Sequence, residues 1–377
     1  MKFLLESLGM TSQCNLNCSY CDWQKDRNFA LSPEQFEKAK AHIEKMGQMM
    51  NERYPDISLV QYSGGEPLLY PEILKEVFRV FHDKWIRINT NGTLLTDEII
   101  QMAKDHGKVY IAVSLDGYTI TANSPRVKGD QKILDTILSN IEKLVEREVP
   151  VMLLCTLNQE NIREFPAYVK YLTDKYEDAI EKGMLVMPTH SVTSYSKDNG
   201  TPDTEVVEQF GNYIKENVDK YKVLSNIKAH YDNLAYFLVH KERKVACSVY
   251  EWSLSMHFRK NDIIDSGKFL SFGCGMRGVH ELGYFDINKD EELERLYQKV
   301  EEYDINRKLD YYNSSKQVSE YNQLNDNCSG KCFPDWVIFD LIFQGIVSIE
   351  EAANWFVLFK DPAIQEKIKK YRSEKEK

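Results

Sequence analysis

Short apolar runs alternate with stretches of helical periodicity through the first half of this chain. The runs lie at 3–9, 57–62, 85–89, 109–115, 151–157 and 184–188. Between them, apolar residues recur at every third or fourth position, as expected of amphipathic helices. Strands that alternate with helices predict a parallel sheet with right-handed crossovers. Six such units indicate an α/β fold, a partial (β/α)6 TIM-like barrel over residues 1–190.

Local signals place helix starts within this pattern. Ser32-Pro33-Glu34-Gln35 is a capping box with proline at the first helical position. Thr96 is a candidate N-cap for the helix that follows the third strand. Polar or glycine-rich turns follow the strands, at the edge where a barrel of this kind carries its chemistry.

The pattern changes after residue 190. Residues 191–222 predict a linker and a bridging helix at 205–221, and residues 223–346 hold four of the eight cysteines without strand–helix alternation. We expect 223–346 to form a cysteine-rich α+β extension. Helices at 348–359 and 362–375 would complete the chain as a C-terminal unit, 347–377.

Composition restricts the partners and the compartment. The 377 residues carry a formal charge of −10, from 48 basic and 58 acidic side chains, and no long basic stripe. Nucleic acid is therefore a poor candidate partner. Because there is no signal peptide and no apolar run long enough to span a bilayer, we predict a cytoplasmic protein that does not bind membranes. Eight cysteines in that compartment favour metal ligation over disulfides.

Three cysteines near the N-terminus carry the strongest chemical signal. Cys14, Cys18 and Cys21 form a C-x3-C-x2-C run directly after the first predicted strand. Three thiolates can hold three irons of a 4Fe–4S cube and leave the fourth iron to a small molecule. A zinc ion would need a fourth protein ligand, and none is close in sequence. A structural zinc knuckle or a chance spacing remains the alternative.

Three further motifs follow in order at the predicted strand ends. They are Ser63-Gly64-Gly65-Glu66-Pro67, Asn89-Thr90-Asn91-Gly92-Thr93, and Ser114-Leu115-Asp116-Gly117 with Arg126 downstream. Together with the cysteine run, they resemble the motifs of the radical S-adenosylmethionine (SAM) superfamily over about the first half of the chain. Taken alone, Gly64-Gly65 and Asp116-Gly117 are also common turns, and Arg126 could form a surface ion pair.

The resemblance implies roles for these residues. Cys14, Cys18 and Cys21 would ligate the cluster, SAM would chelate the open iron, and Tyr20 would lie near the adenine. The backbone of Gly64 and Gly65 would approach the methionyl amino group, and Glu66 would help to hold it. Asn91, Ser114 and Arg126 would contact the ribose or the carboxylate. Asp116 is a candidate catalytic residue that contacts the substrate.

Cys247, Cys274, Cys328 and Cys332 match the number of ligands of a second, auxiliary 4Fe–4S cluster. The segment 265–274 resembles the hairpin that opens a SPASM or twitch extension, and the cysteine count fits the twitch type with one cluster. The gap after Cys247 is longer than in that pattern, and the last pair is C-x3-C. A zinc site with four thiolates therefore stays open.

The resemblance implies an enzyme that cleaves SAM reductively to a 5′-deoxyadenosyl radical, which abstracts hydrogen from its substrate. The extension favours a peptide or protein substrate, modified by crosslinking, epimerisation or oxidation. The alternatives are a dehydrogenase or rearrangement enzyme for a small molecule such as an aminosugar or nucleoside, a sulfur-inserting enzyme, and a non-catalytic cluster or zinc scaffold. We expect flavodoxin or ferredoxin as reductant. Because the barrel begins near residue 3, we expect no N-terminal leader-recognition domain.

Overall fold

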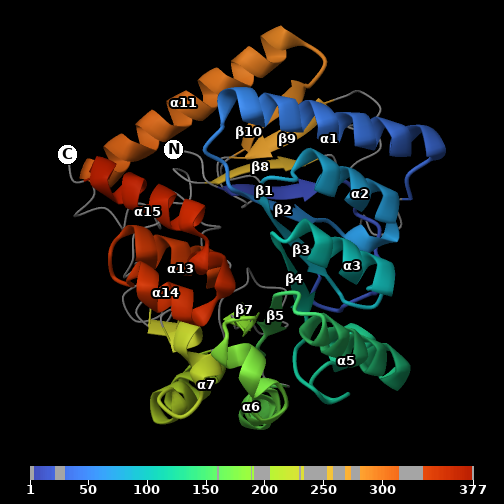
Figure 1. Cartoon of the computed structure of the whole chain (residues 1–377), viewed down its shortest axis with the longest axis vertical. Coiled ribbons are helices and arrows are strands. Elements are labelled where there is room, and N and C mark those ends of the chain that lie inside the picture. Colours follow the sequence, from blue (N-terminus) through green and yellow to red (C-terminus); the bar gives the residue numbers. More distant parts are fainter. Residues whose placement is uncertain are drawn as a thin grey trace.

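A computed structural model describes residues 4–21, 30–158, 161–187, 189–190, 204–228, 231–232, 253–257, 268–272, 281–313 and 334–375. Its centre is a sheet in which six parallel strands follow one another in chain order (Figure 1). This order confirms the predicted α/β partial barrel. The six strands are β1 (Leu4–Gly9), β2 (Leu59–Ser63), β3 (Trp85–Thr90), β4 (Val109–Ser114), β5 (Val151–Thr156) and β6 (Leu185–Val186).

Helices connect these strands, and two of the predicted helix starts are confirmed. The Ser32 hydroxyl accepts a hydrogen bond from the Gln35 amide, and the Gln35 side chain accepts one from the Ser32 amide. Thr96 caps its helix through the Ile99 amide. The connecting elements are α1 (Pro33–Arg53), η1 (Pro67–Leu69), α2 (Pro71–Val80), α3 (Asp97–His106), α4 (Ser124–Val127), α5 (Gln131–Glu146), η2 (Ile162–Glu164) and α6 (Phe165–Glu181).

The two faces of the sheet pack against different parts of the chain. On the outer face, alternate strand residues such as Val60, Ile86 and Ile111 join one core with helices α1, α2, α3, α5 and α6. The residues between them, such as Leu59 and Tyr110, face inward and join a second core with the C-terminal helices. Figure 1 shows these two sets of helices on opposite sides of the sheet. Strands β2 to β6 therefore contribute to a core on each face of the sheet, as parallel strands usually do.

The C-terminal segment covers part of the inner face. It comprises α13 (Pro334–Phe343), α14 (Ile349–Trp355), η5 (Val357–Lys360) and α15 (Pro362–Lys375). The indole nitrogen of Trp85 donates to the Asp361 carboxylate at 2.8 Å, and the Phe356 ring packs edge-on against Tyr110. The prediction of one helix over 348–359 is wrong about where the helix ends. The helix stops at Trp355, because Phe356 is extended and the Val357 amide donates to the Gly183 carbonyl oxygen.

Strands from the predicted extension lengthen the same sheet. β8 (Ser253–His257) pairs in parallel with β1, β9 (Lys268–Phe272) pairs antiparallel with β8, and β10 (Glu281–Asp286) pairs antiparallel with β9. The sequence pattern did not predict that this region would join the barrel sheet. Helix α11 (Asp290–Asn313) packs against β10. The remaining elements are β7 (Thr189–His190), which pairs with β5, α7 (Thr204–Asn217) and η3 (Lys222–Leu224).

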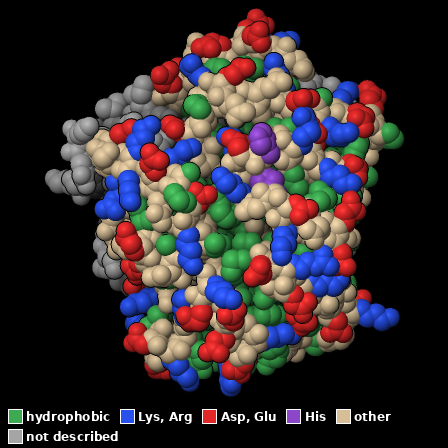
Figure 2. Space-filling model, viewed as in Figure 1, with side chains coloured by type: hydrophobic (Ala, Val, Ile, Leu, Met, Phe, Trp, Pro, Cys, Tyr) green, Lys and Arg blue, Asp and Glu red, His purple; other side chains and the backbone are tan. Residues whose placement is uncertain are grey.

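The surface in this view carries charges of both signs. Lysine and arginine side chains lie interspersed with aspartate and glutamate over the face drawn in Figure 2. Among the described helices, none combines the length and the apolar character that a membrane crossing requires.

Candidate functional site

The segment 10–21, which we call the cysteine loop, leaves β1 and is held by the turns that follow β2, β3 and β4. The Glu66 amide donates to the Gln13 carbonyl oxygen at 2.7 Å, and the Ser19 amide donates to the Pro125 carbonyl oxygen at 2.9 Å. The Asn91 side chain donates to the Asn15 side chain at 2.8 Å. The four motifs identified in the sequence therefore meet at the carboxyl ends of parallel strands, as the barrel fold predicts.

Cys14, Cys18 and Cys21 are each half-buried. Burial raises the pKa of Cys14 to about 11 and also raises the pKa of Cys18. Hydrogen-bond donors nevertheless surround the sulfurs: the Leu16 amide lies 3.4 Å and Asn91 Nδ2 lies 3.8 Å from Cys14 Sγ. Arg126 Nη1 lies 3.9 Å from Cys18 Sγ. Donors of this kind stabilise a thiolate, the form that binds metal.

The donors around these sulfurs fit an iron–sulfur cluster as the group that the loop would hold. Within the described ranges, no three His, Cys, Asp or Glu side chains gather in a group that could hold a metal ion. Donors directed at the ligand sulfurs are also what tunes such clusters.

Gly64 and Gly65 allow the turn after β2 to lie directly on the cysteine loop. A Cβ atom on Gly64 would collide with the Thr11 carbonyl oxygen, and one on Gly65 with the carbonyl oxygens of Ser12 and Gln13. The Gly65 amide donates to the Thr11 carbonyl oxygen at 2.9 Å. The close backbone approach that these glycines permit is therefore made to the cysteine loop itself. Contact with the methionyl group of SAM stays a prediction.

Glu66 joins the turns after β2 and β3. Its carboxylate is fully buried and accepts hydrogen bonds from the Leu68 amide, the Thr90 hydroxyl and the Asn91 amide at 2.7–3.0 Å. Burial raises the pKa of this carboxyl to about 7, although the three donors oppose that change. The position of the turn that carries Asn91 thus depends on Glu66.

Tyr20, Asp116 and Arg126 form a buried cluster beside Cys18. The Tyr20 hydroxyl donates to Asp116 Oδ2 at 2.5 Å, and Arg126 Nη2 donates to the Tyr20 oxygen. Arg126 and Asp116 form an ion pair at 3.3 Å. Burial lowers the pKa of Arg126, but the attraction of Asp116 and Tyr20 outweighs it and raises the pKa overall. Arg126 is therefore a permanent cation next to a cysteine sulfur.

Protein groups enclose the Asp116 carboxylate, and its contact with a substrate stays a prediction. Its side chain is 0% exposed, and Asp116 Oδ1 also accepts a hydrogen bond from the Thr156 amide at 3.0 Å. Among the described residues, Arg126 Nε is buried without a hydrogen-bond partner, which leaves a donor available to an anion. Ser114 is half-buried and ends β4, two residues before Asp116.

Sequence reasoning missed several polar residues that shape this site. Asn123 accepts a hydrogen bond from the Asp116 amide, and Asn161 donates to the Asp116 carbonyl oxygen. On the inner face of β3, the buried Arg87 donates to Asn89 Oδ1 at 2.7 Å. The alternation of polar and apolar residues along β3 could have identified Arg87 and Asn89 as neighbours on one face. The sequence around Asn123 and Asn161 shows no comparable pattern.

The proposed auxiliary ligands Cys247, Cys274, Cys328 and Cys332 lie outside the described residues. The ligation of a second cluster or a zinc ion by these cysteines therefore stays a prediction.

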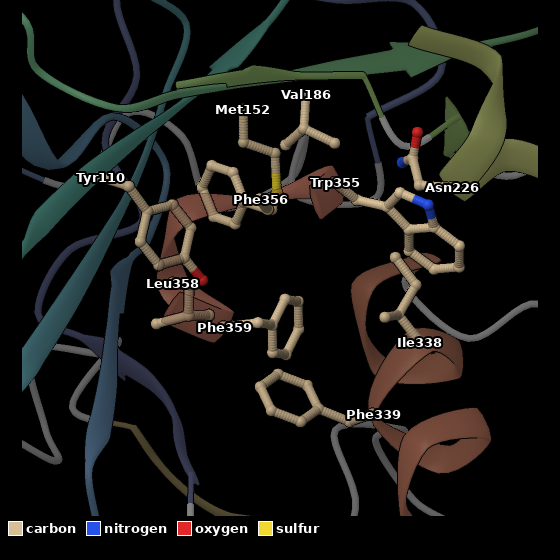
Figure 3. A pocket seen from close by; sticks show the side chains of 10 residues that line it. All are labelled: Tyr110, Met152, Val186, Asn226, Ile338, Phe339, Trp355, Phe356, Leu358 and Phe359. Carbon is tan, nitrogen blue, oxygen red and sulfur yellow. The ribbon is translucent and has the colours of Figure 1, made fainter. Parts of the chain in front are cut away.

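A pocket between the inner face and the C-terminal helices is separate from this site (Figure 3). Figure 3 shows aromatic rings from β4 and from the C-terminal segment around it. Tyr110 and Met152 are the second residues of their strands, so the pocket lies toward the strand ends opposite the cysteine loop. None of its lining residues is charged: Tyr110, Met152, Val186, Asn226, Ile338, Phe339, Trp355, Phe356, Leu358 and Phe359.

Comparison with known proteins identifies the fold and the motif set. Residues 8–172 match the family model of the Radical SAM superfamily. The solved structure of native anSMEcpe with bound AdoMet and Cp18Cys peptide superimposes with a TM-score of 0.53. That similarity covers 80% of this chain and 82% of the other at 17% sequence identity, so it shows a shared fold.

Two curated relatives each match less than half of the chain. Fe-coproporphyrin III synthase of Methanosarcina barkeri is 32% identical over 172 residues, which are 44% of this chain and 40% of the relative. Sporulation killing factor maturation protein SkfB of Bacillus subtilis is 28% identical over 162 residues, which are 42% of this chain and 37% of the relative. The chain thus spans less than half the length of these relatives.

Glu66 should make stability depend on pH. Its pKa is raised from 4.5 to about 7 on folding, so the folded state holds a proton that the unfolded state releases. The contribution of protonated Glu66 to the free energy of unfolding is therefore complete below about pH 4.5 and is lost as the pH rises through about 7. In urea unfolding of metal-free protein, the free energy of unfolding of wild type minus that of Glu66→Gln should fall by about 2 kcal/mol from pH 5 to pH 7.5. A gap independent of pH would contradict a raised pKa.

Removing the Asp116 charge should destabilise the fold strongly. Asp116→Asn keeps the shape but leaves Arg126 buried beside a neutral group, which should lower the free energy of unfolding by about 3 kcal/mol. Asp135→Asn is the matched control, because Asp135 is exposed and bonded to the exposed Gln131. We expect that control to stay within about 0.5 kcal/mol of wild type. Equal effects of the two variants in urea unfolding would show that the ion pair contributes nothing.

Proposed function

Because residues 8–172 form a radical SAM domain, we propose that this protein is an enzyme that abstracts hydrogen from a peptide or protein substrate. The observation that carries the peptide part is the extent of the fold similarity to peptide-bound anSMEcpe. That similarity covers 80% of the chain and so extends well beyond the barrel. The similarity to SkfB, a maturation protein, supports the same substrate class.

Cys14, Cys18 and Cys21 would hold the 4Fe–4S cluster, and its fourth iron would bind SAM. When bound and reduced, the cluster supplies the electron for the cleavage of SAM. The cysteine loop contributes sulfurs that are half-buried and approached by N–H donors from Leu16 and Asn91. Because burial raises the thiol pKa of Cys14 and Cys18, metal binding must displace protons. The donors offset part of that cost.

Arg126 is our candidate for the SAM carboxylate. Its Nε is buried without a partner among the described residues, and its charge is fixed by Asp116. Guanidinium groups suit carboxylates because they present several donors in one plane. Tyr20 would lie near the adenine and Ser114 near the ribose or carboxylate. Asp116 then acts on the site by holding Arg126 and Tyr20.

We expect the substrate to enter the barrel at the carboxyl ends of its strands. The C-terminal helices cover the inner face around Tyr110 and Trp85, toward the amino ends of the strands. A substrate would therefore approach from the carboxyl ends, where the cysteine loop lies. Polar inner-face residues near that end, Asn89 and Thr156, are half-buried and could contact it.

The second set of cysteines would bind a further metal centre in the same enzyme. Cys247, Cys274, Cys328 and Cys332 would bind one auxiliary 4Fe–4S cluster in a twitch-like extension over 223–346, with a zinc site as the alternative. A cluster there would accept the electron that is released when the peptide radical is oxidised. We propose a flavodoxin or ferredoxin as the electron donor.

A small-molecule substrate is the second candidate. The observation that favours it is the 32% identity to Fe-coproporphyrin III synthase, although that match covers only 40% of the relative. Because the match leaves more than half of each protein uncompared, it supports this candidate less than the fold similarity over 80% of the chain supports a peptide.

The test is substrate-stimulated cleavage of SAM under anaerobic reduction. Reconstituted protein would be incubated with SAM, dithionite, and either perdeuterated peptides or a panel of aminosugars, nucleosides and porphyrins. We expect peptides to stimulate 5′-deoxyadenosine formation and to transfer deuterium into it, as mass spectrometry would show. Cys18→Ala should form none, because the cluster loses one of its three protein ligands.

The outcomes separate the hypotheses. Stimulation by a small metabolite and by no peptide would reject the peptide proposal and keep the radical chemistry. No SAM cleavage by fully reconstituted wild type under any condition would reject the enzyme and favour a cluster scaffold.

A further inference from the structure

A closed ring of hydrogen bonds joins the cysteine loop to the turn after β3. Asn15 Nδ2 donates to Thr93 Oγ1 at 2.8 Å, and Thr93 Oγ1 donates to Asn91 Oδ1 at 2.6 Å. Asn91 Nδ2 donates to Asn15 Oδ1 at 2.8 Å, which returns to the first residue. Each side chain thus donates to the next in one direction. Hydrogen bonds in such a chain polarise and strengthen one another.

The ring determines which way the Asn91 amide faces. Asn91 Oδ1 accepts two hydrogen bonds, from the Thr93 amide at 2.9 Å and from the Thr93 hydroxyl. Its Nδ2 must therefore point to the opposite side, where it meets Asn15 Oδ1 and also Cys14 Sγ at 3.8 Å. A rotated amide would present its oxygen, an acceptor, to the sulfur. Both hydrogens of this amide have a defined partner.

We propose that Asn15 and Thr93 are positioning residues that hold Asn91 as an N–H donor to the Cys14 thiolate, and thereby raise the reduction potential of the cluster. Reduction adds negative charge to the cluster, and a donor to a ligand sulfur stabilises the more negative state. Asn91 then acts on the cluster through Cys14, in addition to any contact with SAM. This inference rests on the proposed cluster at the cysteine loop.

Asn91 is buried, but its two partners in the ring lie closer to solvent. Asn15 is exposed and Thr93 is half-buried, so water competes for each of these groups. The Asn91 backbone is held separately by Glu66, which accepts from its amide at 2.7 Å. Loss of the ring therefore leaves the Thr93 backbone amide as the remaining donor to Asn91 Oδ1, and so loosens the Asn91 side chain while the turn keeps its place. The ring can accordingly be tested without removing the turn.

The test compares Thr93→Val, which keeps the shape but lacks the hydroxyl, with Thr93→Ser, which keeps the hydroxyl. The midpoint potential of the anaerobically reconstituted cluster would be measured by redox titration, followed at the paramagnetic signal that SAM shifts. We expect Thr93→Val to reduce the equilibrium constant for one-electron reduction about tenfold, which corresponds to a potential about 59 mV lower. Thr93→Ser should retain the wild-type potential.

Asn15→Ala, at an exposed position, provides a second variant and should lower the potential in the same direction. Both ring variants should also lose iron to a chelator faster than wild type. A wild-type potential in Thr93→Val and Asn15→Ala overturns the inference about the ring alone. A wild-type protein that binds no cluster at the cysteine loop overturns the proposed function, and the inference with it.

Discussion

The site depends on how a loop without regular secondary structure is held in place at the end of a parallel sheet. The loop accepts backbone hydrogen bonds from Gly65 and Glu66 in the turn after β2, and its Ser19 amide donates to the Pro125 carbonyl oxygen after β4. Because the glycines carry no Cβ, the turn after β2 can lie against carbonyl oxygens of the loop. The cysteine loop is therefore held by the connections that follow β2, β3 and β4.

Two buried carboxyl groups at the site, those of Asp116 and Glu66, have different roles because their partners differ in charge. Asp116 and Glu66 are both buried, but they differ in their partners: Asp116 faces the Arg126 guanidinium, whereas Glu66 faces only neutral donors. Accordingly, burial raises the pKa of Glu66, and Asp116 instead anchors a cation beside Cys18. The opposite end of the inner face is apolar and packed by residues such as Phe356 from far along the chain. Polar chemistry is thus concentrated at the carboxyl ends of the strands.

Much of this could be predicted from local sequence. Each strand of the barrel has apolar outer residues, and the caps at Ser32 and Thr96 depend on residues three positions apart. Contacts that are distant in sequence could not be predicted. The pairing of β8 with β1 joins segments about 250 residues apart, and only two of the five residues of β8 are strongly apolar. The motif residues were found, but their partners were not: Glu66 binds the turn after β3, and Asn91 binds Asn15 and Cys14. The spacing of motifs in the sequence identifies the functional residues at a strand end. The hydrogen-bond partner of each residue depends on which turns lie next to one another in the fold.

The central claim is that Cys14, Cys18 and Cys21 bind a cluster with one iron open to SAM. It is tested most directly by the iron and sulfide content of anaerobically reconstituted wild type and of the variant with all three cysteines changed to alanine, with and without SAM. The account predicts that the variant loses about four irons per chain and that SAM alters the paramagnetic signal of the reduced wild type only. Equal iron content in the two proteins, or a wild-type signal unaffected by saturating SAM, would contradict it.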